Sequence, residues 1–256
     1  PKIDLAGQVT VGMEALIRWQ HPQRGMLFAD EFIPLAEQSG LIKPITDMVI
    51  TKAIQQSKAW QEKGIKLNMA INLSLRVLHD RLLPDTLAKL LKQHPKIKNH
   101  IEFEITESAI MLDPESAISM LNQLNDLGIR LSIDDFGKGF TSLSYLKDLP
   151  VVELKIDKSF VTNMISDPNN AAIVHSIIEL GHNTGRSVVA EGVEDRATLD
   201  RLLEFNCDVA QGFYIAKPQS ATELENWLLQ SQWGLSSLSN VTSLSQWKKP
   251  GLRTDP

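Results

Sequence analysis

Acidic and amide side chains gather near the ends of short apolar segments in this sequence. Asp134 and Asp135 stand side by side in "RLSIDDFGKGF", where an apolar segment gives way to a Gly-x-Gly turn. The wider set of such residues is Glu14, Asn72, Glu104, Asp134, Asp135 and Glu191, accompanied by Lys155 and Gln211. These acidic and amide groups offer oxygen ligands and no soft sulfur, which suits hard ions such as Mg²⁺ and Mn²⁺.

Two divalent ions would balance the charge of such a cluster. Carboxylates that converge without a cation repel one another and shift towards their neutral forms. We expect Asp134 to bridge the ions and Asp135 to serve the second ion. Paired ions roughly 3.5–4 Å apart activate a water and stabilise both oxygens of an in-line phosphoryl displacement. Arg18 lies four residues beyond Glu14, about 13 Å away on an extended strand, a reach that suits a second phosphate of a large substrate.

The elements that must position these residues alternate along the chain. Apolar segments typical of strands are 10–17, 66–73, 100–106, 130–135, 152–157, 187–191 and 208–214. Amphipathic segments typical of helices are 30–40, 45–64, 83–93, 114–128, 170–185, 196–205 and 222–230. This alternation predicts an α/β protein with a parallel sheet and outer helices, and 256 residues suit one TIM-type (β/α)8 barrel. Seven strands are one too few, so we expect the N-terminal helix and most of the first strand to be missing.

The period of two in these segments gives each strand one apolar and one polar face. In "HIEFEIT", Ile101 and Phe103 oppose Glu102 and Glu104, and "ELKID" alternates in the same way. The apolar face must meet the helices, so the polar face points into the barrel, which branched apolar residues normally fill. The same feature on most strands favours a functional site at their C-terminal ends over a structural salt-bridge network.

Composition narrows the classes of function and location. The net charge of −5 leaves no basic surplus, so we expect no DNA binding. The single Cys207 permits no internal disulfide and fits no zinc spacing, and no segment is apolar enough to span a bilayer. We predict a cytoplasmic domain, or the cytoplasmic part of a membrane-anchored parent. Residues 1–230 form one domain in this interpretation. The Ser- and Leu-rich residues 231–256 are a weakly ordered tail, a partner-contact segment, or a cover for the edge left by the missing strand.

Eight ordered blocks between about residue 8 and residue 230 resemble the EAL-domain family of cyclic di-GMP phosphodiesterases. The signature Glu14-Ala15-Leu16 stands within "EALIRW". The blocks that follow are "FIPLAEQSG", "INLS", "EITES", "DDFGKGFTSLSYL", "LKIDKSFV", "VVAEGVE" and "QGFYIAKP". The resemblance implies a barrel that hydrolyses one phosphodiester bond of cyclic di-GMP to give linear pGpG in bacterial second-messenger signalling.

The resemblance also implies a role for each matching residue. Metal ligands would be Glu14, Asn72, Glu104 and Asp134, with Asp135 on the second ion. Lys155 would position or polarise the attacking water, and Glu191 would bind metal or act as general base. Gln211 would support the metal-bound water or the ligand, and Arg18 would contact the phosphodiester. Glu107 would hold the loop 135–143, which in this family couples metal binding to a homodimer interface. An upstream sensory or GGDEF domain is a further expected partner.

The loop departs from the family pattern, because Lys138, Phe140 and Thr141 stand where Thr, Tyr and Ser are usual. Phe140 lacks a hydroxyl and Lys138 adds a charge near the dimer-coupling loop, so we expect altered regulation and not loss of activity. Other interpretations stay open. The two aspartates are also typical of a turn, and Lys155 also suits a buried ion pair. A catalytically silent cyclic di-GMP receptor is the main alternative, and an unrelated Mg²⁺ barrel enzyme that uses Lys155 on an enolisable acid is another.

Overall fold

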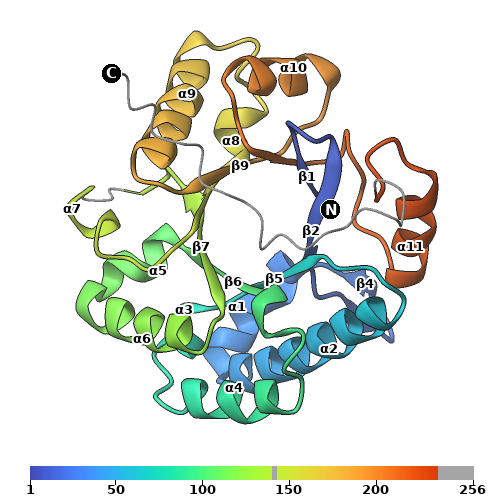
Figure 1. Ribbon diagram of the computed structural model, residues 1–256. Helices are drawn as coiled ribbons and strands as arrows, with labels where there is room; N and C mark the ends of the chain where they lie inside the picture. Colours follow the sequence, from blue (N-terminus) through green and yellow to red (C-terminus); the bar gives the residue numbers. More distant parts are fainter. Residues whose placement is uncertain (140–142, 236–256) are drawn as a thin grey trace, which may run out of the picture.

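The chain folds as a closed barrel of strands surrounded by helices (Figure 1). The computed structural model describes residues 1–139 and 143–235. The barrel strands are β1 Lys2–Asp4, β2 Val9–Ala15, β5 Asn68–Asn72, β6 Ile101–Thr106, β7 Arg130–Phe136, β8 Glu153–Ile156, β9 Ser187–Glu191 and β10 Val209–Gln211. Around the ring they follow the order β1-β10-β9-β8-β7-β6-β5-β2. The predicted TIM-type α/β barrel is therefore confirmed.

The helices lie outside the barrel and connect successive strands. They are α1 Ala29–Ser39, α2 Ile42–Glu62, α3 Leu75–Leu78, α4 Leu83–Lys92, α5 Glu107–Leu112, α6 Pro114–Asp126, α7 Leu143–Leu146, α8 Lys158–Val161, α9 Pro168–Asn183, α10 Arg196–Glu204 and α11 Ala221–Gln230, with a 3₁₀ turn η1 Lys98–His100. All seven predicted helices are present. Local signals fix their ends: Asp113, Asp167 and Asp195 each accept a backbone N–H at a helix start.

The eighth strand is the short segment Lys2–Asp4, and it closes the barrel. This strand pairs antiparallel with Val9–Ala15 on one side and with Val209–Gln211 on the other. The other neighbouring strands of the ring pair in parallel. Three residues are enough to close the ring, so no open edge remains for another segment to cover.

The two faces of the strands separate as the period of two predicts. Ile101, Phe103 and Ile105 are at most 1% exposed and belong to the main hydrophobic cluster. On the opposite face, Glu102 and Glu104 are equally buried, at 2% and 1%. Buried carboxylates require partners, and these glutamates contact lysines inside the barrel. The barrel interior therefore holds ion pairs in place of the usual apolar layers.

Two further regions complete the described chain. A separate hairpin of β3 Trp19–His21 and β4 Gly25–Leu27 follows β2. Residues 231–235 follow α11, and there the Trp233 carbonyl accepts from the Thr10 backbone N–H at 3.0 Å. The rest of the predicted tail, 236–256, lies outside the described residues. No helix in the described ranges has the length and apolarity to cross a membrane.

Candidate active site

The predicted polar residues meet at the C-terminal ends of the parallel strands. Strand register sets their height: Asn72 pairs with Glu104 across β5 and β6, and Glu191 pairs with Gln211 across β9 and β10. Residues in register on adjacent strands lie at the same level of the barrel. This end of a parallel barrel carries the active site in essentially every characterised enzyme of this architecture.

Lys155 is the centre of the cluster. Its side chain is completely buried, and its Nζ lies 2.8 Å from Glu104 Oε2, 3.1 Å from Asp134 Oδ1 and 2.6 Å from Glu191 Oε1. Burial alone would lower the pKa of this lysine, but the surrounding carboxylates, Glu104 first, raise its pKa well above the usual value. Lys155 is therefore a permanent, fixed cation. Lys155 does form buried ion pairs, and all three of its partners are predicted site residues.

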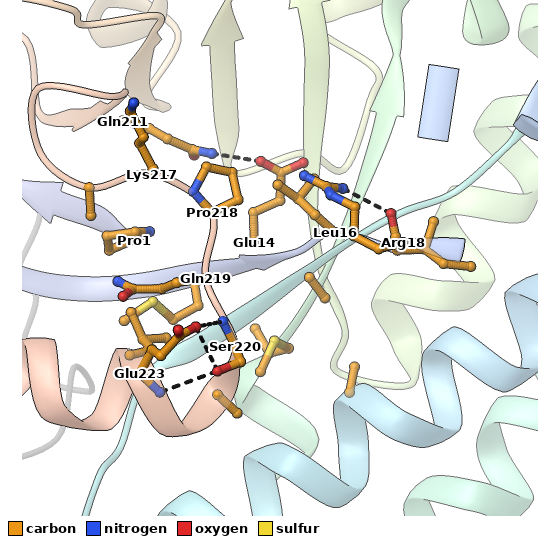
Figure 2. Close-up of a pocket in the computed structure, with 18 of the residues that line it drawn as sticks. Pro1, Glu14, Leu16, Arg18, Gln211, Lys217, Pro218, Gln219, Ser220 and Glu223 are labelled. Carbon is orange, nitrogen blue, oxygen red and sulfur yellow. Dashed lines mark hydrogen bonds between the residues drawn. The ribbon is translucent and has the colours of Figure 1, made fainter. Parts of the chain in front are cut away.

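Glu14 occupies the neighbouring part of the cluster. Its Oε1 accepts from Asn72 Nδ2 and its Oε2 accepts from Gln211 Nε2, each at 2.6 Å; Figure 2 shows the Gln211 side chain reaching Glu14. Burial opposes ionisation of Glu14, but the charge of Lys155 and the Gln211 hydrogen bond lower its pKa overall. Two amides thus hold an ionised carboxylate in one orientation.

Asp134 and Asp135 lie at the C-terminal end of β7, as predicted, and the strand forms a bulge there. The pairing of β7 with β8 shifts between Ile133 and Phe136, and the strand resumes at Phe136. Asp135 has a φ of 54°, a left-handed conformation that few residues other than glycine adopt. Its backbone N–H donates to Asp134 Oδ1 at 2.8 Å. Backbone strain of this kind clusters at functional sites, and here it separates the two neighbouring carboxylates into two clusters.

The second cluster contains a residue that the sequence analysis did not select, Asp157. Lys138 Nζ lies 3.1 Å from Asp135 Oδ1 and 2.7 Å from Asp157 Oδ2. Asp157 also accepts from the Ser159 backbone N–H at 2.9 Å. Although burial opposes ionisation, these hydrogen bonds, that of Lys138 first, hold the pKa of Asp157 far below its usual value. The signal in the sequence was "LKID", in which Asp157 shares the polar face of Lys155.

Glu107 fixes the backbone that leaves the bulge. Its Oε2 accepts from the backbone N–H of Gly137 at 2.9 Å and of Gly139 at 3.2 Å. Gly137 has a φ of +100°, and a Cβ there would come within 3.1 Å of Ile177 and Phe160. The predicted contact between Glu107 and the loop is therefore present as far as Gly139. Phe140 and Thr141 lie outside the described residues.

A cleft of about 1040 Å³ opens next to the first cluster, and Glu14, Asp134, Glu191, Gln211 and Arg18 line it. Lys52, Lys158 and Lys217 also line it, together with Glu194 and Glu223, so both cations and carboxylates face the cleft. Arg18 follows the strand and does not extend it, because β2 ends at Ala15. Its guanidinium bonds the Ile17 carbonyl at 2.8 Å and stacks 4.8 Å from the centre of the Phe28 ring.

The donor set fits hard divalent ions by its chemistry. Burial, with the neighbouring charges of Asp134 and Glu14, raises the pKa of Glu191 from 4.5 to about 8 despite the opposing charge of Lys155. The first cluster thus holds more acidic groups than its single buried ammonium neutralises. As the side chains stand, no three His, Cys, Asp or Glu of the described residues converge on one point where an ion would bind. Lysine ammonium and amide groups contact the carboxylate oxygens instead.

Comparison with known proteins agrees with this geometry. The family model described as "EAL domain" matches residues 1–218. MucR of Pseudomonas aeruginosa, a bifunctional diguanylate cyclase/cyclic di-GMP phosphodiesterase, is 40% identical over 88% of this chain and 33% of its own length. The cyclic di-GMP phosphodiesterase PdeR of Escherichia coli is 37% identical over 89% of this chain and 34% of its own. The chain thus spans about a third of these relatives.

A solved structure is similar over nearly its whole length. The c-di-GMP complex of the PaMucR phosphodiesterase shares 40% identity and a TM-score of 0.84, covering 88% of this chain and 91% of that one. Sequence blocks, barrel topology and cluster geometry lead to one assignment: the chain belongs to the EAL domain family.

Proposed function

We propose that this chain hydrolyses cyclic di-GMP to linear pGpG with the help of Mg²⁺ or Mn²⁺. The observation that carries the proposal is the cluster of Glu14, Asp134 and Glu191 around the Lys155 ammonium, beside a cleft that Arg18 also lines. Relatives at 37–40% identity that are named as cyclic di-GMP phosphodiesterases support the substrate. Complete retention of the acidic set favours an enzyme over a silent receptor.

The ions would be held by Glu14, Asn72, Glu104, Asp134, Asp135 and Glu191, and Asp157 joins them because it shares Lys138 with Asp135. When bound, such ions lower the pKa of a water and offset the charge of a phosphodiester. Asn72 donates to Glu14 in this structure, so it would have to present its carbonyl oxygen to act as a ligand.

Three side chains would each have a further role in the reaction. Lys155 is always charged, so it can stabilise developing negative charge, and it can orient the attacking water once one of its three carboxylates turns from the ammonium to a bound ion. Glu191 has its pKa raised to about 8, which suits a group that accepts a proton from that water near neutral pH. Arg18 has a planar fork that matches phosphate oxygens, provided that it leaves Phe28.

The test is incubation with cyclic di-GMP and Mg²⁺ or Mn²⁺, followed by chromatography of the nucleotides. We expect pGpG with the parent chain and none with Glu14→Gln, which keeps the size of the residue and removes its charge. Glu223→Gln is the matched control, because Glu223 lines the same cleft but caps α11 through Ser220. Binding of the nucleotide without product at any ion concentration would refute the proposal and favour the receptor.

Three further expectations remain proposals. We propose a homodimer coupled to the site through the loop that Glu107 holds, supported by its bonds to Gly137 and Gly139. We propose a cytoplasmic location, in keeping with a single, buried cysteine. A sensory or GGDEF domain in a longer parent is proposed from the length of the relatives, of which this chain covers about a third.

A further inference from the structure

Among the described residues, three lysines each contact two or more carboxylates, and one of them differs from the other two. Lys2 and Lys155 are 5% and 0% exposed, and each contacts three carboxylates within 3.1 Å. Lys138 also bridges two carboxylates, Asp135 and Asp157, but its side chain is 47% exposed. Two of these ammonium groups are locked in the core, and the third is attached to the site by a flexible, solvated stem.

The pair that Lys138 bridges needs a cation. Asp157 is 1% exposed and Asp135 is 40% exposed, and one ammonium lies within 3.1 Å of an oxygen of each. Two carboxylates this close to one another bind either a proton or a cation. Lys138 supplies that cation, and a divalent ion bound by the same oxygens would make its charge redundant.

The ammonium of Lys138 can also move away from the two carboxylates. It stands between Gly137 and Gly139, and its own side chain is 47% exposed, so solvent screens its pair with Asp135 and reaches the ammonium of its pair with the buried Asp157. A lysine ammonium is a compact point charge on a mobile four-carbon stem and lacks the fixed fork of an arginine. Its departure costs two contacts that a divalent ion at Asp135 and Asp157 would replace.

We propose that Lys138 is a tethered cation that competes with a divalent ion for the Asp135–Asp157 pair. An ion binds there only after the ammonium has moved away, so Lys138 weakens this site and sets the ion concentration at which it fills. This inference rests on the proposed function, because it concerns the ions of the same site. It also gives the residue that departs from the family pattern a defined role.

The test measures ion binding in the absence of nucleotide. Mn²⁺ is titrated into the parent chain, Lys138→Met, Lys138→Arg and Lys158→Met, with bound ions followed by calorimetry and by the electron paramagnetic resonance of free Mn²⁺. Lys138→Met should bind one Mn²⁺ roughly tenfold more tightly, since a tenfold gain needs only about 1.4 kcal/mol of lost competition. Lys138→Arg keeps the charge and should stay near the parent. Lys158→Met removes an equal charge from the residue next to Asp157, and Lys158 lines the cleft and makes no ion pair with a described residue.

A second measurement follows the ammonium itself. Lysine acylation is quantified by mass spectrometry with and without Mn²⁺, and Lys138 should react several-fold faster when the ion displaces it. Lys43 is the internal control, because it is 50% exposed and paired with Asp80 at 2.6 Å on other elements. Its rate should not change.

The outcomes separate the inference from the proposed function. Equal Mn²⁺ affinity in the parent and Lys138→Met, or an equal gain in Lys158→Met, overturns the role of Lys138 while cleavage of cyclic di-GMP continues. Unchanged Lys138 acylation on ion binding overturns it as well. If no variant binds Mn²⁺ and none cleaves cyclic di-GMP, the proposed function fails together with the inference.

Discussion

Replacing Glu153 by glutamine should stabilise the fold above pH 7, although it removes one partner of a buried lysine. Glu153 Oε1 lies 2.8 Å from Lys2 Nζ, and Lys2 also contacts Glu102 and Glu104. Burial, followed by the charge of Glu102, raises the pKa of Glu153 from 4.5 to about 7. Its carboxyl group therefore holds a proton more tightly in the folded chain than in the unfolded chain.

The size of the effect follows from proton linkage. A raised pKa gives stability that is complete below pH 4.5 and is lost as the pH rises through 7. The shift of about 2.5 units corresponds to about 3 kcal/mol, at about 1.4 kcal/mol per unit. Glutamine is neutral in both states, so Glu153→Gln should exceed the parent chain by about 3 kcal/mol at pH 8 and by less than about 1 kcal/mol at pH 5.

Glu102 provides a matched variant with the opposite sign. Burial opposes its ionisation, but the charges of Lys2 and then Arg130 lower its pKa from 4.5 to about 2. This lowered pKa gives stability that is complete above pH 4.5 and is lost as the pH falls through 2. Glu102→Gln should therefore lose about 3 kcal/mol at pH 5, and less at pH 8, where removal of the Glu102 charge also eases the ionisation of Glu153. Lys2 thus contacts one carboxylate, Glu102, whose ionisation stabilises the fold, and another, Glu153, whose ionisation does not.

The assay is urea unfolding at both pH values, followed by circular dichroism and tryptophan fluorescence with a chelator present. The chelator removes ion binding at the site from the comparison, and coincident transitions by the two probes justify a two-state analysis. Destabilisation by Glu153→Gln at pH 8 equal to that by Glu102→Gln would show that both carboxylates are ionised and favourable. That result would refute the reasoning.

Three other perturbations test the site. Lys155→Met should abolish formation of pGpG and lower the free energy of unfolding by about 3–5 kcal/mol, because it leaves three carboxylates without their shared ammonium; product chromatography and urea unfolding check this, and a stable, active variant would contradict it. Affinity for Mn²⁺ should fall about tenfold per pH unit below 8, since a proton competes for Glu191, whose pKa is raised to about 8; titrations at pH 6, 7 and 8 measure it, and a flat profile would oppose it. Glu107→Ala should destabilise the chain by about 1–3 kcal/mol and speed amide exchange at Gly137 and Gly139, which lose their acceptor; unchanged exchange would count against this contact.

The alternation of apolar and polar residues within each segment was sufficient to predict most of the barrel strands. The alternation of Ile101, Glu102, Phe103 and Glu104 identified both faces of β6, and the same period marked the other long strands. Lys2–Asp4 was expected only as the remnant of a first strand, because three residues show no period and one of its partners, β10, lies far away in the sequence. The segment is a strand because it pairs with β2 on one side and β10 on the other, and its own sequence does not show this pairing.

The site residues were also predicted in part from local pattern. Glu14, Asn72 and Gln211 were predicted from their places on strands, and the structure brings all three into contact. The contacts of Lys138 depend on a bulge with a left-handed residue at Asp135. No periodic pattern reports such a bulge, so the sequence indicated an added charge near the loop but not the two carboxylates that receive it.

The closing strand and the reaction centre share one side chain. Lys2 contacts Glu104 Oε1 and Lys155 contacts Glu104 Oε2, each at 2.8 Å. Glu104 is 1% exposed, so water cannot replace either contact if one of them lengthens. A small displacement of β1 must therefore redistribute charge around Lys155. A strand of only three residues is thus a route by which force on it would change the electrostatics of the proposed site.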